Sequence, residues 1–267
     1  MIMSDFRGAA QGGISRDFVS KVHFRLPPLD EQRRIVAVLD RAAEIRRRAE
    51  AARAKARAII PALFLDTFGD PLANPKGWET VRLGSLAKLI GGGTPAKANS
   101  DFWGGNIPWV SPKDMKPPVI VDSGDKITEA ATRASPVNLI PAGNVVVVVR
   151  GMILAHTVPI RINAIPVTLN QDMKAIVPDI GITSVFLRWA LQSLHGYLLS
   201  KIRESAHGTK KLESAVLTEL PLTVPPLALQ TAFSEQVQRI EALARKLDAA
   251  AAKAEALAAA LAAELFE

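Results

Sequence analysis

The stretch LPPLDEQRRIVAVLD, from Leu26 to Asp40, returns in altered form as VPPLALQTAFSEQVQ, from Val224 to Gln238. Each stretch contains Pro-Pro-Leu, two further residues and Gln, and each is followed by a long run without proline or glycine. Proline restricts its own φ and moves the residue before it out of the helical region. Each copy therefore predicts an extended lead-in to a long helix.

The two copies align without a gap as far as Phe68 and Phe266. The motif residues Pro27, Pro28, Leu29 and Gln32 align with Pro225, Pro226, Leu227 and Gln230. Charged residues match as well: Arg41 with Arg239, Arg47 with Arg245, and Lys55 with Lys253. These matches are more specific than those between alanines, so the chain contains a true internal repeat, although two copies are too few for a solenoid.

Apolar residues recur at steps of three and four in both copies, which predicts a coiled coil. The predicted seam of the first helix is Ile35, Leu39, Ala42, Ile45, Ala49, Ala52, Ala56, Ile59 and Leu63. That of the second is Phe233, Val237, Ile240, Leu243, Leu247, Ala250, Ala254, Leu257 and Leu261. The first helix is rich in Arg and Lys and the second in Asp and Glu, so we expect the two to pair, in one chain or between two. We favour an antiparallel pair within one chain that also offers a face for dimerisation.

Between the helices the composition changes. Short β-branched runs bounded by Gly, Pro and Asn predict a β-rich domain, and TSVFLRWALQSLHGYLLSKI, residues 183–202, has helical spacing. The predicted fold class is α+β: a β-rich domain at residues 70–222, flanked by long helices at 27–69 and 223–267 that form an antiparallel coiled coil. Residues 1–26 form a separate leading segment.

Composition excludes several function classes. The chain has no cysteine, which excludes disulfides and zinc-thiolate sites and suits a reducing cytoplasm. The N-terminus does not resemble a secretory signal, and the most apolar run, Val145–Val149, is far too short for a membrane span and predicts a buried strand. We therefore expect a cytoplasmic protein without membrane contact. A net charge of +7 favours an anionic partner.

No catalytic residue is predicted. GGGTPAK, residues 91–97, lacks the Gly-Lys-Ser/Thr ending of a phosphate-binding loop and is interpreted as a turn. Asp114 and Lys116 have the spacing of some nucleases but no companion acidic residue in a convincing strand. The Asp/Asn-Pro-Pro-aromatic motif of adenine methyltransferases is absent. The histidines lie far apart along the chain, so no metal site is predicted.

Several cationic, polar and aromatic side chains of the central domain are candidates for DNA contact. Lys and Arg bind phosphates and guanine, and Gln can bond adenine. The candidates are Lys97, Trp109, Lys113, Lys116, Arg150, Gln171, His207, Thr209, Lys210 and Lys211. Alternatives remain open for each type. Trp109 and the nearby Trp103 could be core residues, Gln171 could serve a turn, and the lysines could be solvated.

The ordered motifs resemble those of the specificity subunit of Type I restriction-modification systems. They are LPPLDEQRRIV, a GGTP turn followed by FWGGNIPWVSPKDMK, then VVRGMILAHTVPI, LNQDMKAIVP, and a GTKK turn before LTELPLTVPPLALQ. The resemblance implies target-recognition domains that each read half of a split DNA site, separated by two helices that act as a ruler. It implies that methyltransferase subunits, which bind S-adenosylmethionine and modify adenine, dock on the helices near the two Pro-Pro-Leu-x-x-Gln motifs. A motor-nuclease subunit would join for restriction, and this chain would bind no cofactor directly.

The chain departs from this family pattern in having a single recognition domain. Residues 1–26 resemble the end of a missing first domain, with Ile14 and Phe18 aligned to Leu212 and Val216. The resemblance thus implies half a specificity subunit, for which a homodimer around a two-fold axis would read a symmetrical split site. The alternatives are an inactive truncated fragment, a protein-binding adaptor without salt-dependent DNA binding, and an autonomous nuclease, for which no acidic cluster is found.

Overall fold

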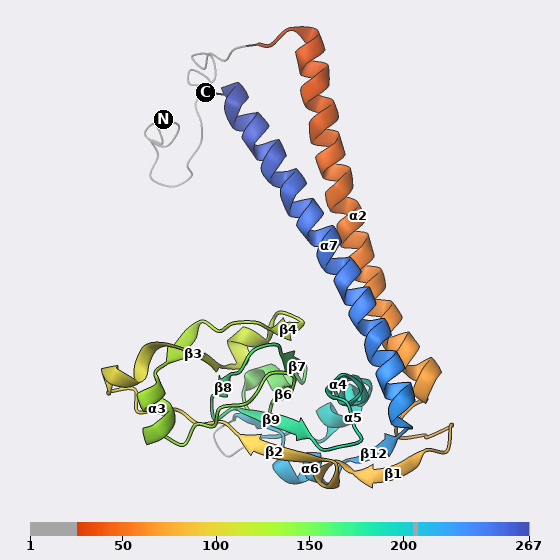
Figure 1. Cartoon of the computed structure of the whole chain (residues 1–267), viewed down its shortest axis with the longest axis vertical. Helices are drawn as coiled ribbons and strands as arrows, with labels where there is room; N and C mark the ends of the chain where they lie inside the picture. Colours follow the sequence, from red (N-terminus) through yellow and green to blue (C-terminus); the bar gives the residue numbers. More distant parts are fainter. Residues whose placement is uncertain (1–25, 205–207, 267) are drawn as a thin grey trace. The chain divides into compact units, whose positions relative to one another are not determined.

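The computed structural model describes residues 26–204 and 208–266, and the chain divides into two compact units. One unit is Ala56–Glu241, and the other combines Met1–Lys55 with Ala242–Glu267. The fold is α+β, as predicted, with a β-rich domain and long helices at both ends of the described chain (Figure 1). The predicted leading segment at residues 1–26 lies, apart from Leu26, outside the described residues.

A five-stranded sheet is the centre of the larger unit. Its strand order is β2 (Ala87–Gly91), β9 (Met173–Pro178), β6 (Val145–Val148), β7 (Ile160–Asn163) and β4 (Val119–Ile120). Neighbours are antiparallel except β4 and β7, which are parallel. The valine run forms the central strand and is fully buried, which confirms its prediction. Helix α4 (Ser184–Ser193) packs against β6, β7 and β9, and α5 (His195–Ser200) follows it.

A smaller sheet has the order β5 (Asp125–Ile127), β3 (Trp103–Val110) and β8 (Thr168–Leu169). Helix α3 (Glu129–Ala134) and the 3-10 turn η3 (Ser100–Phe102) lie beside β3. This sheet has its own small core, formed by Trp109, Ile127, Ala131 and Val137. The turn at residues 170–172 leads from β8 into β9 and so connects the two sheets.

Two short antiparallel ribbons complete the domain. Strand β1 (Glu79–Arg82) pairs with β12 (Pro221–Val224), which brings the two ends of the β-rich region together. Strand β10 (Arg203–Glu204) pairs with β11 (Lys210–Lys211). The remaining short elements are η2 (Leu83–Ser85), η4 (Pro112–Met115), η5 (Met152–Ala155) and α6 (Ser214–Thr218). Helices α2 (Leu29–Phe68) and α7 (Leu227–Phe266) end and begin near the predicted domain limits.

An aromatic cluster joins the helix ends to the sheet domain. The rings of Phe64 and Phe68 of α2 pack against each other and against Phe186 of α4 and Phe233 of α7, with centroids 4.9–5.7 Å apart. All four side chains are fully buried or nearly so. Full burial of one such side chain stabilises the fold by about 1.5–3 kcal/mol, and each ring contact adds about 0.5–1.5 kcal/mol. The last turns of α2 and the first turns of α7 therefore belong to the same core as the sheet.

The two helices are antiparallel in the smaller unit, as predicted (Figure 1). The Nε of Arg53 lies 2.5 Å from the Oδ1 of Asp248, while Arg46 lines a groove with Glu255. Moving backwards along α2 thus corresponds to moving forwards along α7. The hydrogen bond to Asp248 raises the pKa of the Arg53 guanidinium, which agrees with the predicted pairing of a basic helix with an acidic one.

The seam of α2 differs from the prediction at Leu39, which is 39% exposed, and at the C-terminal end of the helix. Ile59, a predicted seam residue, is 50% exposed, whereas Ile60, Phe64 and Phe68 are buried. An α-helix has about 3.6 residues per turn, so a seam of strict three and four steps drifts around the helix. The inward face of α2 has moved by one residue where the helix reaches the aromatic cluster.

The seam of α7 was also assigned partly to the wrong residues. Leu243 and Leu257 are exposed, and so is Ala250, whereas the neighbouring alanines Ala244, Ala251 and Ala258 are half-buried. Together with the other seam positions, these alanines give a regular alternation of four and three steps. Where two adjacent positions are both apolar, the smaller residue faces the partner helix because it permits close approach of the backbones.

None of the helices in residues 26–204 and 208–266 is long and apolar enough to cross a membrane. Over the same residues, no group of three or more His, Asp or Glu side chains is placed to hold a metal ion.

Candidate nucleic-acid interface

The glycine-rich turn at residues 91–95 is built by close approach to the turn at 170–172. The N–H of Gly93 donates to the carbonyl of Leu169 at 2.9 Å. A Cβ on Gly92 would lie 1.9 Å from the carbonyl oxygen of Asn170, so only glycine fits there. A Cβ on Gly93 would lie 2.7 Å from the carbonyl oxygen of Pro136, so these two glycines serve chain packing, in agreement with the interpretation of the run as a turn. Beside it, the hydroxyl of Thr94 donates a hydrogen bond to the Oε1 of Gln171, whose side chain is exposed.

Trp109 supports this turn from the interior. Its side chain is 8% exposed, and its Nε1 donates to the carbonyl of Gly93 at 2.9 Å. Trp103 packs edge-on against it with ring centroids 5.2 Å apart. Trp109 therefore has neither a free donor nor an exposed face for a base, and we remove it from the predicted contact residues. The alternative interpretation of Trp109, as a residue of the protein core, is confirmed.

The turn at 170–172 also holds the end of the central valine strand. The carbonyl of Asp172 accepts the N–H groups of Val149, at 2.8 Å, and Arg150, at 3.1 Å. On the other side, the N–H of Leu212 donates to the carbonyl of Val149 at 2.9 Å. These backbone bonds bring Arg150, Gln171, Lys210 and Lys211, far apart in sequence, to one edge of the domain. We call these four residues the basic edge.

Ion pairs compensate part of the charge on the basic edge. Lys210 is paired with Glu204, and the Nζ of Lys211 lies 2.9 Å from Glu213. Arg150 is exposed and has no carboxylate partner among the described residues. Exposed ion pairs contribute less than about 1 kcal/mol, so both lysines can exchange a glutamate for a phosphate at little cost.

Three other candidates lie near this edge in sequence or in space. Thr209 precedes Lys210 and is half-buried, and Lys97 is exposed in the loop that follows the glycine-rich turn. His207 lies outside the described residues. Whether any of these residues contacts DNA stays a prediction.

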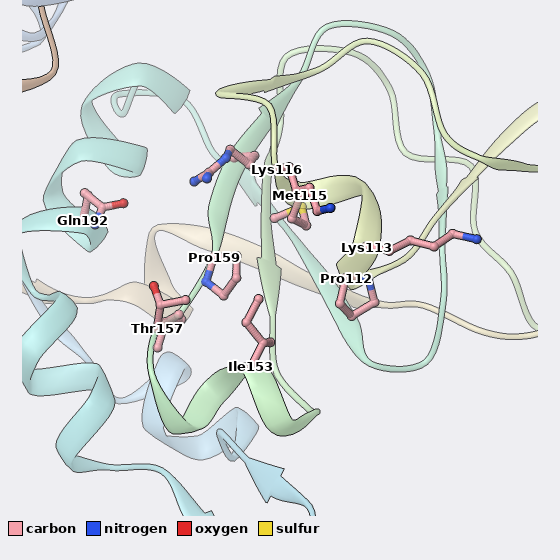
Figure 2. Close-up of a pocket in the computed structure, with 10 residues that line it drawn as sticks. Pro112, Lys113, Met115, Lys116, Ile153, Thr157, Pro159 and Gln192 are labelled. Atoms are coloured by element: carbon pink, nitrogen blue, oxygen red, sulfur yellow. The ribbon is translucent and has the colours of Figure 1, made fainter. Parts of the chain in front are cut away.

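A second group of predicted cations lines a pocket of about 510 Å³. Figure 2 shows Lys113 and Lys116 on one wall, with Ile153, Thr157 and Pro159 on the segment opposite. The Nζ of Lys113 lies 2.6 Å from Asp125, and this hydrogen bond raises the pKa of Lys113. Lys116 is exposed and has no carboxylate partner within the described part of the chain.

Asp114, the acidic residue of the Asp-x-Lys spacing, is used to build the turn η4. Its Oδ2 accepts the N–H and the hydroxyl of Ser111 at 2.9 and 3.0 Å. Its Oδ1 accepts the N–H of Gly124 at 3.0 Å. Both carboxylate oxygens are thus engaged in local structure, which accounts for this spacing without a nuclease.

Arg161 is the pocket cation that the sequence analysis missed. Its Nε donates to the carbonyl of Pro117 at 2.7 Å, and its Nη1 donates to Ile160 at 2.8 Å. Burial lowers its pKa, but no carboxylate among the described residues neutralises it. The nearby Arg188 is buried on α4, and burial lowers its pKa to about 10, with a smaller contribution from the charge of Arg161. A cation between apolar residues of a strand, as in Ile160-Arg161-Ile162, was the signal available in the sequence.

The two Pro-Pro-Leu-x-x-Gln motifs have the same local geometry. The Nε2 of Gln32 donates to the carbonyl of Pro27 at 2.8 Å, and that of Gln230 donates to Pro225 at 2.9 Å. The glutamine thus fixes the extended lead-in against the first turn of the helix. Gln230 makes two further bonds, donating to Gly181 at 3.0 Å and accepting the N–H of Thr183 at 2.9 Å.

Comparison with known proteins relates this arrangement to one family. The family model described as Type I restriction modification DNA specificity domain matches residues 75–254. The Type I restriction enzyme EcoR124I/EcoR124II specificity subunit of Escherichia coli is 34% identical over 171 residues, which are 64% of this chain and 42% of that protein. The MjaIX specificity subunit of Methanocaldococcus jannaschii is 30% identical over 125 residues, or 45% of this chain and 27% of that protein. The chain therefore spans less than half the length of either relative.

The fold is similar to that of a solved structure as well. The HsdS subunit of Thermoanaerobacter tengcongensis matches with a TM-score of 0.55 and 23% identity, over 98% of this chain and 65% of that one. At this identity the likeness concerns the fold: a β-rich domain combined with long helices.

Proposed function

Because the chain belongs to the family of Type I restriction modification DNA specificity domains, we propose that it recognises a DNA sequence for a Type I restriction-modification complex and has no catalytic activity of its own. The observation that carries this proposal is the family match over residues 75–254, which include the whole basic edge and the cationic pocket. The surplus of positive charge on these two surfaces supports a nucleic-acid partner.

In this proposal the β-rich domain reads half of a split site. The amide of Gln171, whose Oε1 accepts a hydrogen bond from Thr94, bonds a base edge in this proposal. The cations Arg150, Lys210 and Lys211, with Lys97 and the pocket residues Lys113 and Lys116, bind phosphates and set the position of the domain on the duplex.

The helices serve assembly in the same proposal. Methyltransferase subunits dock on them and supply S-adenosylmethionine, and the restriction subunit joins this complex. Support comes from Leu29 and Val36, which are exposed and have no covering residue among those described. Apolar side chains exposed along one helix face are typical of an interaction surface. Two copies of the chain, paired around a two-fold axis, would present two recognition domains.

Co-expression with a compatible Type I methyltransferase subunit, followed by mapping of modified adenines across the genome, tests the proposal. A palindromic split motif is expected if two copies of this chain pair. An asymmetric motif would assign the second half-site to another chain. If the complex forms but no motif is modified, the DNA-recognition proposal is wrong and a protein-binding adaptor is the better description.

A further inference from the structure

Between the basic edge and the cationic pocket, the turn η5 exposes two apolar side chains. Met152 is 63% exposed and Ile153 is 38% exposed, whereas the next residue, Leu154, is buried in the main core. We call Met152 and Ile153 the apolar tip. Single exposed apolar residues are common and need no explanation. This pair differs from such residues because its backbone is fixed and cations lie on both sides of it.

The backbone of the tip is held at both ends. The N–H of Gly151 donates to the carbonyl of Lys210 at 3.0 Å, and Gly151 has a φ of 127°, a value that favours glycine. After the tip, the N–H groups of His156 and Thr157 both donate to the carbonyl of Ile153 at 3.0 Å. The tip is therefore preformed, and a partner would bind it with little loss of conformational entropy.

Cations flank the tip on both sides. Arg150 lies two residues before Met152 and forms a β-bridge with Lys211 of the basic edge. On the other side, Ile153 lines the pocket that also contains Lys116 and Arg161, as Figure 2 shows for the labelled Ile153 and Lys116. No acidic residue occurs from Arg150 to Arg161, and none is among the residues that line this pocket.

An apolar surface between two cationic ones is complementary to a DNA groove. Phosphates border a groove on both strands, and the bases between them offer one strongly apolar group, the 5-methyl of thymine, in the major groove. We propose that Met152 and Ile153 contact a thymine methyl group in the recognised half-site, while Arg150 and Lys211 on one side and Lys116 and Arg161 on the other bind phosphates. This inference rests on the proposed DNA-recognition function and names the residues that give part of its base preference.

The two kinds of contact make different contributions to binding. Phosphate contacts supply salt-dependent affinity without sequence information, whereas the tip supplies preference at one or two base pairs. Truncation of the tip should therefore leave affinity for unrelated DNA unchanged. The position that it reads should become degenerate, because a wrong base pair typically costs about 1–3 kcal/mol, or about 5- to 150-fold in affinity.

The test uses the full chain, co-expressed with a methyltransferase subunit, and duplexes selected from a random-sequence library. The selected duplex is then remade with deoxyuridine in place of each thymine in turn, which removes only the methyl group. For the wild-type chain we expect one replacement to weaken binding by about fourfold, the effect of losing one buried methyl-sized group. The Met152→Ala/Ile153→Ala variant should bind the thymine and uracil duplexes equally.

Ile180→Ala is the matched control, because Ile180 is a fully exposed isoleucine on the turn before α4, outside the pocket and the basic edge. It should discriminate thymine from uracil as the wild type does. If the tip variant also discriminates like the wild type, or if no uracil replacement weakens wild-type binding, the thymine assignment is wrong while DNA recognition stands. If the wild-type complex forms but selects no sequence, the proposed function itself fails.

Discussion

The two copies of the Pro-Pro-Leu-x-x-Gln motif differ in their surroundings although their backbones are alike. In both, the glutamine donates to the carbonyl of the first proline. Gln230 is completely buried and also bonds Gly181 and Thr183 of the β-rich domain, whereas Gln32 is partly exposed. The shared bond shows what the motif does in itself: it fixes the start of a long helix. Docking against the β-rich domain is an additional role, which the second copy performs here.

The contrast continues one turn further along each helix. Phe233 is buried in the aromatic cluster, while the aligned residue of the first copy, Ile35, is half-buried. Val237 is likewise buried, and the aligned Leu39 is exposed. The first copy thus keeps the apolar pattern of a docked helix, although Leu39 is 39% exposed. This supports the proposal that a partner binds the first copy.

The largest expected effect is on the aromatic cluster. Phe233→Ala should lower the free energy of unfolding by about 3–5 kcal/mol, because it opens a cavity beside the rings of Phe64 and Phe68. The aligned change, Ile35→Ala, should cost roughly 1 kcal/mol, since its side chain is only half-buried. Urea denaturation of both variants measures the difference. Equal losses would mean that the first copy is as deeply buried as the second.

The glutamines provide the next test. Gln230→Ala leaves the N–H of Thr183 and the carbonyls of Pro225 and Gly181 without their partner, which should cost about 2–3 kcal/mol. Gln32→Ala removes one partly exposed bond and should cost about 0.5–1 kcal/mol. Thermal unfolding of the two variants checks this order. A Gln32→Ala loss as large as that of Gln230→Ala would contradict the view that docking distinguishes the copies.

Sequence reasoning predicted the helices and the buried valine strand, because each depends on local periodicity or on a repeat. The antiparallel direction of the helix pair was expected from the family resemblance. It could not choose between adjacent apolar positions, such as Ile59 and Ile60 or Leu243 and Ala244. That choice depends on where the partner helix lies, and no local pattern contains this information. The same limit explains why the sequence could not tell which DNA-contact candidates are already paired or buried. That Lys210 meets Glu204, and that Trp109 lies under the glycine-rich turn, follows from tertiary contacts alone.

The exposed face of the first copy should matter for assembly and not for folding. Leu29→Ser combined with Val36→Ser should change the free energy of unfolding by less than about 0.5 kcal/mol, since both side chains are exposed. Binding of a co-expressed methyltransferase subunit, or self-association, should weaken by at least about fivefold, as for loss of an interface residue worth 1 kcal/mol. Copurification measures binding of the methyltransferase subunit, and sedimentation measures self-association. Leu139→Ser, at an exposed leucine outside both helices, is the control and should assemble as the wild type does. Unchanged assembly of the double variant would remove this surface from the proposal.

The smallest of the expected effects comes from loss of the ion pair between the helices. This pair has no counterpart at the aligned positions of the repeat. Arg53 pairs with Asp248, but the positions aligned with them are Ala251 and Glu50, which cannot form an equivalent pair. Both charged side chains are partly exposed, so Arg53→Ala should cost less than about 1 kcal/mol. Because salt screens such a pair, the difference from wild type in urea denaturation should shrink as the salt concentration rises. A larger loss that salt does not reduce would mean that the arginine acts through packing of its aliphatic stem, and the apolar seam would then hold the helices together without electrostatic help.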